Sequence, residues 1–156
     1  MEKIASFTVN HLKLNPGVYQ SRQDYVGEEV ITTFDLRMTA PNKEPVMNTA
    51  EIHTIEHLGA TFLRNDEEFK DKTIYFGPMG CRTGFYLLTR NTAPEKVLEV
   101  TKKVLEQIVN HKGKVFGATR KECGNFRDLN LESAQKECKE YLKVLAFGMH
   151  DFKYKS

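Results

Sequence analysis

The stretch that most constrains this chain is Glu-Ile-His-Thr-Ile-Glu-His-Leu at residues 51–58. Ile52 and Ile55 recur at helical spacing and predict an amphipathic helix. His53 and His57 are four positions apart, so their side chains lie about 40° apart around the helix axis and one turn apart along it. Two imidazoles in that arrangement can reach one divalent metal ion. The segment therefore predicts a helix whose polar face supplies two ligands of a metal site.

Glu56 directly precedes the second histidine and lies about 60° from His53, on the side away from His57. A carboxylate in that position is better placed to move protons beside a metal than to bind the metal. The pattern His-x-x-Glu-His is the inverted form of the zincin motif, in which the glutamate is the base. The same two histidines are equally compatible with an exposed polar helix face that binds nothing, so spacing alone leaves the metal site open.

A metal site needs at least one more protein ligand, and a catalytic site also keeps one position open. The candidates are the three cysteines, His11 and the acidic residues. Cys138 falls at helical spacing among apolar residues and is expected to be a small buried hydrophobic side chain. Cys81 and Cys123 each adjoin a glycine in an expected turn, where the backbone permits close approach of a ligand. The residues leave open which of these two binds metal, which reacts, or whether both are merely reduced thiols.

The order of the expected elements is that of an α+β protein. Strands are expected at residues 4–9 and at residues 30–38, a stretch rich in β-branched and aromatic side chains. A hairpin-like pair follows at residues 72–77 and 82–90, joined by Gly-Pro-Met-Gly. The glycine-bearing segment 113–126 is expected to be loop or short strand.

Three helices complete the expected set. The first runs to about residue 63, with Asn48 or Thr49 as its cap. The second runs to about residue 111 and is opened by a capping box of Thr92 and Glu95. The third covers roughly residues 131–145.

The length of 156 residues, without a repeat, linker or shift in composition, predicts one domain covering residues 1–156. A hydrophobic fraction of 40% with mixed charges argues against disorder, and a net charge of +2 is too small to imply nucleic-acid binding. No apolar stretch is long enough for a signal peptide or a membrane span. Three widely spaced cysteines do not suggest a disulfide framework, so we expect a soluble cytoplasmic protein.

Four motifs occur together along the chain. They are Phe-Asp-Leu-Arg at residues 34–37, His-Thr-Ile-Glu-His-Leu at 53–58, Gly-Pro-Met-Gly-Cys-Arg-Thr-Gly at 77–84 and Cys-Gly-Asn-Phe at 123–126. Their combination resembles the LuxS family of S-ribosylhomocysteine lyases, which make the precursor of autoinducer-2. The resemblance extends from Ser6 to the last expected helix, and every ligand and catalytic residue type of the family is present.

The resemblance implies roles for particular residues. The metal ligands it implies are His53, His57 and Cys123. The two acid–base groups it implies are Glu56 and Cys81. Around the substrate it places Ser6, His11 and Arg37, with Arg64 at the amino-acid end. The metal it implies is ferrous iron, with zinc or cobalt able to substitute; the softness of the donors suits zinc as well as iron, so iron rests on the resemblance.

The same resemblance implies a fold and an assembly. The fold would be an α+β arrangement of an antiparallel sheet packed with helices, of the kind found in metallohydrolase domains like those of mitochondrial processing peptidase. The assembly would be a homodimer with each active site built across the interface. The partners would be the small-molecule substrate and the second subunit, with no nucleic acid and no membrane.

The implied reaction cleaves the thioether of S-ribosyl-L-homocysteine to L-homocysteine and 4,5-dihydroxy-2,3-pentanedione without consuming water. The sugar carbonyl moves from C1 to C2 and then to C3, after which the sulfur leaves C5 by β-elimination. Each carbonyl shift leaves negative charge on oxygen, which a divalent metal stabilises as a Lewis acid. A thiolate at Cys81 and the carboxylate of Glu56 would move the protons. The neighbouring Arg82 would assist Cys81 only if its side chain points toward the sulfur.

Two other classes of protein match parts of the pattern. An inverted-zincin metallopeptidase would use Glu56 to activate water for attack on an amide, but its third ligand is usually a downstream glutamate, and Cys123 in that role argues against it. A binding module with a structural metal would have four protein ligands in a closed site. Hydrolysis of a peptide, with no release of free thiol from S-ribosylhomocysteine, would indicate the metallopeptidase. An open coordination position on the metal would exclude the binding module.

Overall fold

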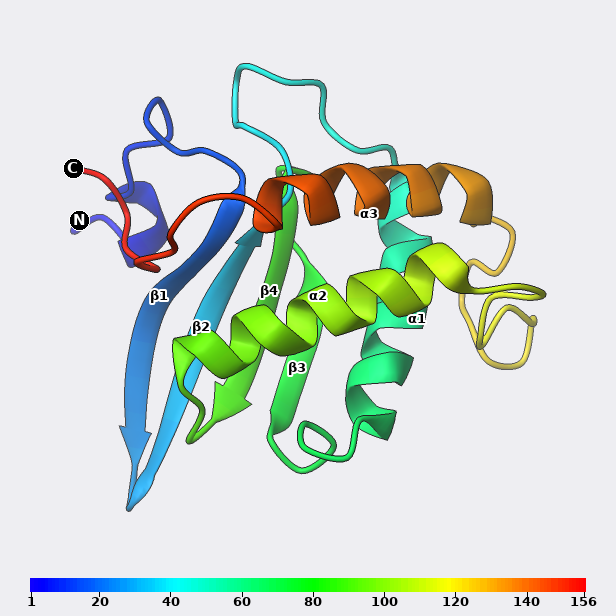
Figure 1. The fold of residues 1–156 in the computed structure, drawn as a ribbon, viewed down its shortest axis with the longest axis horizontal. Helices are drawn as coiled ribbons and strands as arrows, with labels where there is room; N and C mark the ends of the chain where they lie inside the picture. Colours follow the sequence, from blue (N-terminus) through cyan, green and yellow to red (C-terminus); the bar gives the residue numbers. More distant parts are fainter.

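A computed structural model describes all 156 residues (Figure 1). Four antiparallel strands form one sheet in the order β1-β2-β4-β3. The strands are β1 (Gly17–Val26), β2 (Glu29–Arg37), β3 (Thr73–Pro78) and β4 (Gly84–Arg90). The helices are α1 (Thr49–Asn65), α2 (Pro94–Asn110) and α3 (Leu131–Leu145), preceded by a short 3-10 helix, η1 (Ala5–Phe7). The predicted α+β class is confirmed.

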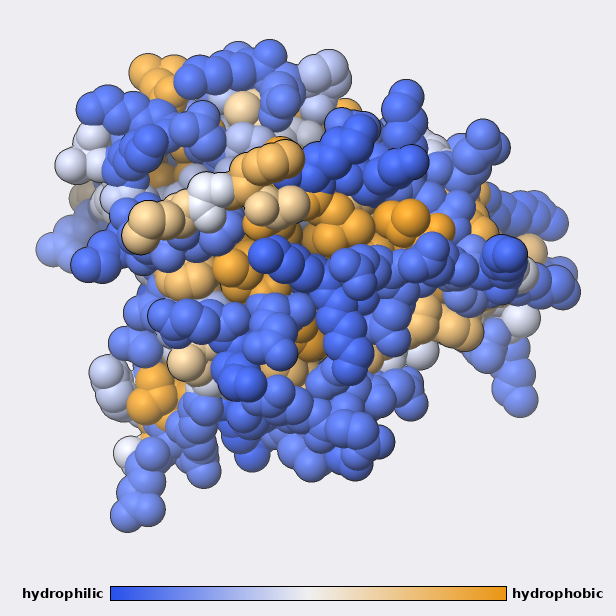
Figure 2. Space-filling view, viewed as in Figure 1, coloured by the Kyte–Doolittle hydropathy of each residue, from blue (hydrophilic) through white to orange (hydrophobic).

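One face of the sheet carries the apolar core, because successive side chains along a strand point to opposite faces. Phe34 pairs with Leu87 across β2 and β4, Leu36 pairs with Phe85, and all of these side chains are buried. Helices α2 and α3 cross this side of the sheet, in front of the strands in Figure 1. Figure 2 shows apolar surface between these two helices, surrounded by polar side chains. All three helices contribute to the core that packs on the sheet.

The opposite face of the sheet carries a polar row. Tyr19, Asp35, Tyr86 and Gly77 pair in register across β1, β2, β4 and β3. Asp35 and Arg37, two residues further along the same strand, are only 1% and 3% exposed. Buried charges are tolerated when they are paired, so this face must be organised around an ion pair.

Helix α1 begins as the sequence predicts. The Asn48 side chain accepts a hydrogen bond from the Glu51 amide at 2.9 Å, and the Glu51 carboxylate accepts one from the Asn48 amide at 3.0 Å. This capping box satisfies two amides that the first helical turn would otherwise leave without partners. Ile52 and Ile55 are buried, so His53 between them lies on the less buried side of the helix.

Two expectations about the N-terminal third are wrong. Residues 4–9 do not form a strand; Ala5–Phe7 form the 3-10 helix η1. The apolar side chains Ile4 and Phe7 are three residues apart, a spacing that suits one helical turn. Strand β1 is not predicted, because its sequence Gly-Val-Tyr-Gln-Ser-Arg-Gln-Asp-Tyr-Val is mostly polar and only its first two residues are buried.

The predicted capping box at the start of α2 is also wrong. Ala93 occupies the cap position and makes no side-chain hydrogen bond. The Thr92 hydroxyl lies one residue too early and donates to the Arg90 carbonyl at 2.7 Å instead. Pro94 starts the helix without a cap, since a proline at the first position has no amide hydrogen to satisfy. None of the three helices combines the length and apolar character that a membrane crossing requires.

Candidate metal and acid–base sites

His53 and His57 of α1 meet Cys123, which lies in the loop between α2 and α3. The ligand atoms of these three side chains all lie within 4.8 Å of one another, and all three residues are half-buried. The Cys123 Sγ is 3.4 Å from the His53 Nε2. Sulfur and nitrogen ligands at ordinary metal distances and a tetrahedral angle are about 3.5 Å apart. We call this group the His–His–Cys cluster, and its donor set fits a divalent transition ion.

Main-chain carbonyls orient both imidazoles. The His53 Nδ1 lies 2.9 Å from the Asp128 carbonyl oxygen, and the His57 Nδ1 lies 2.7 Å from that of Phe116. A carbonyl oxygen can only accept, so each Nδ1 carries the hydrogen in these bonds. The lone pair of each Nε2 is then free for a metal, the arrangement common among metal-binding histidines.

The loop between α2 and α3 also fits closely around these side chains. Gly117 has a φ of +72°, and a Cβ added there would lie 3.2 Å from the His57 Nδ1. The Cys123 amide donates to the Thr119 carbonyl at 3.0 Å, which fixes the cysteine backbone. The Asn125 amide lies 3.4 Å from the Cys123 Sγ and donates to it, which helps to hold the sulfur in place. One loop thus supplies a ligand and orients the other two.

No fourth His, Cys, Asp or Glu ligand atom joins the His–His–Cys cluster. Structural transition-metal sites are usually closed by four protein ligands, whereas catalytic sites use three and keep a position for another group. The third side chain is a thiol and not the glutamate expected of an inverted zincin. Glu56 is half-buried on α1 and forms no hydrogen bond or ion pair, so its carboxylate remains available for other chemistry.

A second group of side chains surrounds Cys81, which is exposed in the turn between β3 and β4. The Cys81 Sγ lies 3.0 Å from the Thr83 hydroxyl and 3.9 Å from the Arg37 Nη1. Arg37 Nη1 also donates to the Thr83 Oγ1 at 2.8 Å. The guanidinium beside Cys81 is therefore that of Arg37, from the neighbouring strand, and not that of the adjacent Arg82.

Arg37 is held by a two-point ion pair with Asp35. Its Nε donates to the Asp35 Oδ1 at 3.1 Å, and its Nη2 donates to the Oδ2 at 2.7 Å. The Tyr154 hydroxyl donates to the same Oδ2 at 2.8 Å. Burial disfavours the charge on Arg37, but the bonds to Asp35 outweigh it and raise the pKa of Arg37. We call Asp35, Arg37, Cys81, Thr83 and Tyr154 together the Arg37 cluster.

The remaining predicted substrate residues make hydrogen bonds outside both clusters. Ser6 is in η1, and His11 follows it with its Nδ1 2.8 Å from the Val9 carbonyl oxygen. Arg64, in the last turn of α1, donates to main-chain carbonyls of Thr73 and Ile74. No hydrogen bond or ion pair within the chain joins these residues to either cluster.

The amino-acid sequence alone does not identify Thr83, Tyr154 or the pairing role of Asp35. Asp35 lies inside the motif Phe-Asp-Leu-Arg, two residues before Arg37, and this strand spacing places both on one face. That spacing is the signal that could have found it. Tyr154 has no comparable signal, because its contact depends on how the C-terminal residues fold back. Cys138 is completely buried, as predicted, and burial raises the pKa of its thiol.

The α+β fold with a three-ligand His–His–Cys cluster on a helix and a loop defines a class of candidate metalloenzymes. A family model described as S-ribosylhomocysteinase (LuxS) matches residues 4–150. The chain therefore belongs to the S-ribosylhomocysteinase (LuxS) family.

Individual relatives agree with the family match. The chain is 57% identical to an S-ribosylhomocysteine lyase of Finegoldia magna over 146 residues, which cover 93% of this chain and 92% of the relative. It is equally similar, over the same shares, to an S-ribosylhomocysteine lyase of Clostridium acetobutylicum. A protein of that name from Clostridium beijerinckii is 54% identical over 150 residues, 96% of this chain and 94% of the relative.

Proposed function

We propose that this chain is an S-ribosylhomocysteine lyase, a carbon–sulfur lyase that converts S-ribosyl-L-homocysteine to L-homocysteine and 4,5-dihydroxy-2,3-pentanedione. Family membership and relatives of that name support the activity. The observation in the molecule that carries the proposal is the His–His–Cys cluster, which has three ligands and room for another group. The product pentanedione is the autoinducer-2 precursor that the family is expected to supply.

The three ligands of the His–His–Cys cluster would hold one divalent ion per chain. We propose ferrous iron, with zinc or cobalt as possible substitutes, since imidazole and thiolate donors suit all three. When bound, the ion supplies Lewis-acid stabilisation for the negative charge that develops on the sugar oxygens. Metal analysis of protein purified without added metal tests the identity of the ion.

Two side chains are proposed to move the protons. Cys81, with Thr83 and Arg37 beside its sulfur, takes a proton from the carbon next to the carbonyl and returns it to the neighbouring carbon. Glu56 acts on the sugar hydroxyls and on the C4 proton during β-elimination, because its carboxylate has no other partner. As the C4 proton is removed, the C5–sulfur bond breaks and the sulfur leaves with the electron pair.

Four residues are proposed to hold the substrate: Ser6, His11, Arg37 and Arg64. The Nη1 of Arg37 lies 3.9 Å from the Cys81 Sγ, so Arg37 would meet the sugar from the side that carries Cys81. Its guanidinium is almost completely buried within the chain. The guanidinium of Arg64 caps two carbonyls of β3, a position that suits an outer contact with the amino-acid end of the substrate.

We propose that the active protein is a homodimer with sites shared between chains. Several large apolar side chains are exposed near the two ends of the chain, an arrangement that suits a protein interface. Among them are Phe7 at 71%, Leu12 at 70%, Phe147 at 76% and Met149 at 102%. Since no bond within one chain joins Ser6 and His11 to the other proposed groups, a second subunit is a reasonable source of these contacts.

Three further proposals complete the description. Residues 1–156 form one lyase domain, in keeping with a core that includes both Val18 and Phe152. Its fold is related to that of metallohydrolase domains like those of mitochondrial processing peptidase. The protein acts in the cytoplasm, where its three free cysteines stay reduced and Cys123 remains available as a ligand.

The activity is tested by incubating the purified protein with S-ribosylhomocysteine and measuring free thiol. We expect thiol release that requires the bound ion, and none from a Cys81→Ala variant that still binds metal. Release of amino groups from a peptide substrate, with no thiol from S-ribosylhomocysteine, would instead support the metallopeptidase alternative.

The shared site is tested by mixing two inactive variants, His57→Ala and Cys81→Ala. If each site uses the His–His–Cys cluster of one chain and Cys81 of the other, a mixed dimer regains one complete site. Random assortment then restores about a quarter of the wild-type activity. No recovery after verified subunit exchange would show that both groups act within one chain.

A further inference from the structure

A path of hydrogen bonds connects the C-terminal residues with the sulfur of Cys81. The Tyr154 hydroxyl donates to the Asp35 Oδ2, and the Arg37 Nη2 donates to the same oxygen. The Arg37 Nη1 donates to the Thr83 Oγ1, which lies 3.0 Å from the Cys81 Sγ. The path joins side chains that are distant in the sequence, and every step is 3.0 Å or shorter.

Thr83 gives the path a direction. Its hydroxyl oxygen accepts from Arg37, which can only donate, so the Thr83 hydrogen is not used in that contact. The Cys81 Sγ is the acceptor within reach of that hydrogen. The hydroxyl therefore donates to the sulfur, and both Thr83 and Arg37 stabilise negative charge there.

Tyr154 is held firmly in place for its contact with Asp35. Its ring stacks on that of Tyr19, with centroids 5.1 Å apart and an angle of 17° between the planes. The Gln20 amide of β1 donates to the Phe152 carbonyl at 2.8 Å, and the Phe152 side chain is buried. Figure 1 shows the last residues of the chain beside β1. The hydroxyl is thus presented to Asp35 by packing and by main-chain bonding.

Several phenols lie near the Arg37 cluster, in addition to the charged Arg82 next to Cys81 in the sequence and Asp151 near Tyr19. Tyr19 on β1, Tyr86 on β4 and the core residue Tyr141 on α3 are the phenols whose pKa responds to the charges of Asp35 and Arg37. Burial, followed by the negative charge of Asp35, raises the pKa of each of these phenols. The pKa of Tyr154 is raised for the same two reasons, so its hydroxyl keeps its hydrogen. Because these phenols are uncharged, they add no charge near Cys81. The charges that reach Cys81 from strand β2 are those of Asp35 and Arg37.

Tyr154 also lies outside residues 4–150, the part of the chain that the family model matches. The other members of the Arg37 cluster all lie inside it. The contact with Asp35 thus links a segment beyond the matched region, through Arg37 and Thr83, to the proposed catalytic Cys81.

We propose that Tyr154 is a positioning residue for the lyase reaction, which tunes the reactivity of Cys81 through Asp35 and Arg37. By donating to Asp35, the phenol offsets part of the negative charge of the carboxylate. More of the positive charge of Arg37 is then available to the Cys81 thiolate. The proposal rests on the proposed function, in which Cys81 moves protons.

The test measures how fast iodoacetamide alkylates Cys81 in the intact, metal-loaded protein from about pH 5 to about pH 9. Mass spectrometry of the Cys81 peptide separates this reaction from those of Cys123 and Cys138. Tyr154→Phe keeps the ring and removes only the hydroxyl. Tyr25→Phe is the matched control, because Tyr25 is 73% exposed and its hydroxyl has no hydrogen-bond partner.

In Tyr154→Phe we expect the pH profile of alkylation to move up by about half a unit, which at neutral pH means an approximately threefold slower reaction. The Tyr25→Phe profile should match that of the wild type. Turnover of S-ribosylhomocysteine by Tyr154→Phe should fall by a similar factor at neutral pH with KM unchanged, and should recover at higher pH.

The outcomes separate this proposal from the proposed function. An unchanged alkylation profile in folded, metal-loaded Tyr154→Phe overturns the role of Tyr154, whatever the activity. If alkylation shifts in Tyr154→Phe but the wild-type protein releases no thiol from S-ribosylhomocysteine, the role of Tyr154 is retained and the lyase activity is rejected. Tyr154→Ala, which loses ring and hydroxyl together, must shift the profile at least as far as Tyr154→Phe. A smaller shift would also contradict the proposal.

Discussion

The His–His–Cys cluster is oriented by main-chain groups, whereas the Arg37 cluster is oriented by other side chains. Carbonyls of Asp128 and Phe116 fix the two imidazoles, and all three ligands are half-buried. In the Arg37 cluster, Asp35 and Arg37 are almost completely buried and neutralise each other. The His–His–Cys cluster contains no positively charged side chain to pair with its donor atoms, whereas in the Arg37 cluster the charges of Asp35 and Arg37 cancel.

This difference separates what each group contributes. Donor atoms that have no positive partner in the protein are stabilised most when a cation binds. Substitutions in the His–His–Cys cluster should therefore reduce metal affinity more than they reduce the stability of the fold. A buried ion pair loses most when one partner is removed, because the other charge is left without compensation. Variants in the His–His–Cys cluster should therefore lower mainly the metal content, and variants of the Asp35–Arg37 pair should lower mainly the free energy of unfolding.

The largest expected effect is the loss of the ion on changing Cys123. Cys123→Ala removes one of three ligands, and a loss exceeding the 10–100-fold typical of outer-shell changes is expected in metal affinity. We expect turnover to fall by about a thousandfold or more, with metal content measured by atomic emission. The matched control is Cys138→Ala, a completely buried thiol remote from the cluster, which should keep its ion. Equal metal loss in both variants would contradict the assignment.

The next effect tests the charge pairing of the Arg37 cluster. Asp35→Asn leaves the Arg37 guanidinium buried beside a neutral amide, and removing one partner of a buried pair typically costs about 3–5 kcal/mol. Urea unfolding of the metal-loaded protein should show that loss, with metal content unchanged. In Asp24→Asn, which breaks the exposed Arg22–Asp24 pair, the unfolding midpoint should stay at the wild-type value. Similar losses in both variants would remove the distinction.

A smaller effect tests how closely the loop fits around His57. Gly117→Ala adds a Cβ 3.2 Å from the His57 Nδ1 at a positive φ, and we expect metal affinity to fall about tenfold, within the range for groups that orient a ligand. Gly113→Ala is the control, since Gly113 also has a positive φ but open space around it. Competition with a chelator measures both affinities. If the two alanines weaken binding equally, backbone strain is the cause and the fit around His57 is not.

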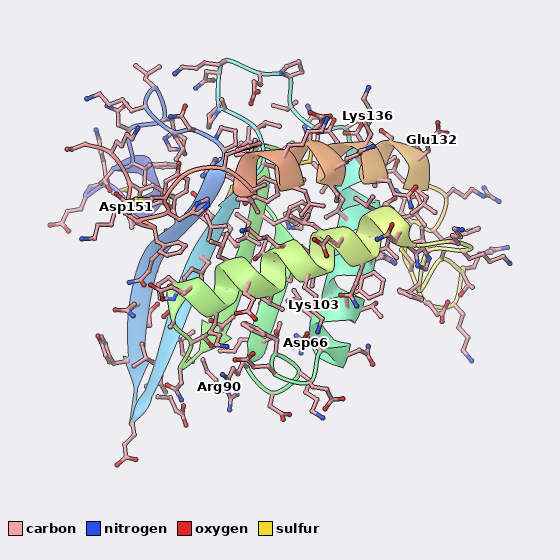
Figure 3. All side chains as sticks on the ribbon, viewed as in Figure 1. Asp66, Arg90, Lys103, Glu132, Lys136 and Asp151 are labelled. Atoms are coloured by element: carbon pink, nitrogen blue, oxygen red, sulfur yellow. The ribbon has the colours of Figure 1, made fainter.

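The smallest effect concerns Asp66, a buried carboxylate paired with the exposed Lys103 of α2 (Figure 3). Burial opposes ionisation, but the Lys103 contact and the amides of Phe69 and Glu68 lower the pKa of Asp66. Asp66→Asn should cost about 0.5–1 kcal/mol at neutral pH. A lowered folded-state pKa gives stability that is present above the unfolded value, near pH 4, and is lost as the pH falls through the folded value.

Thermal unfolding at several pH values checks this pair. The difference between wild type and Asp66→Asn should shrink steadily below about pH 4. A difference that stays constant into acid would mean that shape, and not charge, accounts for the effect. With one exposed partner, this pair should lie well below Asp35–Arg37 in its contribution to stability.

Elements with strong local signals were predictable from the sequence. Helix α1 has a capping box and apolar residues at helical spacing, and β2 has a run of β-branched and aromatic side chains. Strand β1 lacks such a signal because its sequence is mostly polar. It is a strand because its backbone pairs with β2, which a local pattern does not reveal. The 3-10 helix η1 is too short for periodicity to distinguish it from a strand.

The candidate site shows the same division. The spacing of His53 and His57 follows from one helix, so the sequence predicts it directly. The approach of Cys123 depends on a loop, and the residues alone left Cys81 and Cys123 as alternatives until the family resemblance separated them. The contacts of Arg37 with Thr83 and of Asp35 with Tyr154 cross between distant segments, where local patterns carry no information.

The loop between α2 and α3 has a consequence for which changes the chain can tolerate. Phe116 and Asp128 orient the imidazoles through their carbonyls, which any residue could supply, while Cys123 between them acts through its sulfur. Inserting or deleting a single residue would shift these three points relative to one another. The spacing of this segment should therefore be under stricter selection than the identity of most of its amino acids.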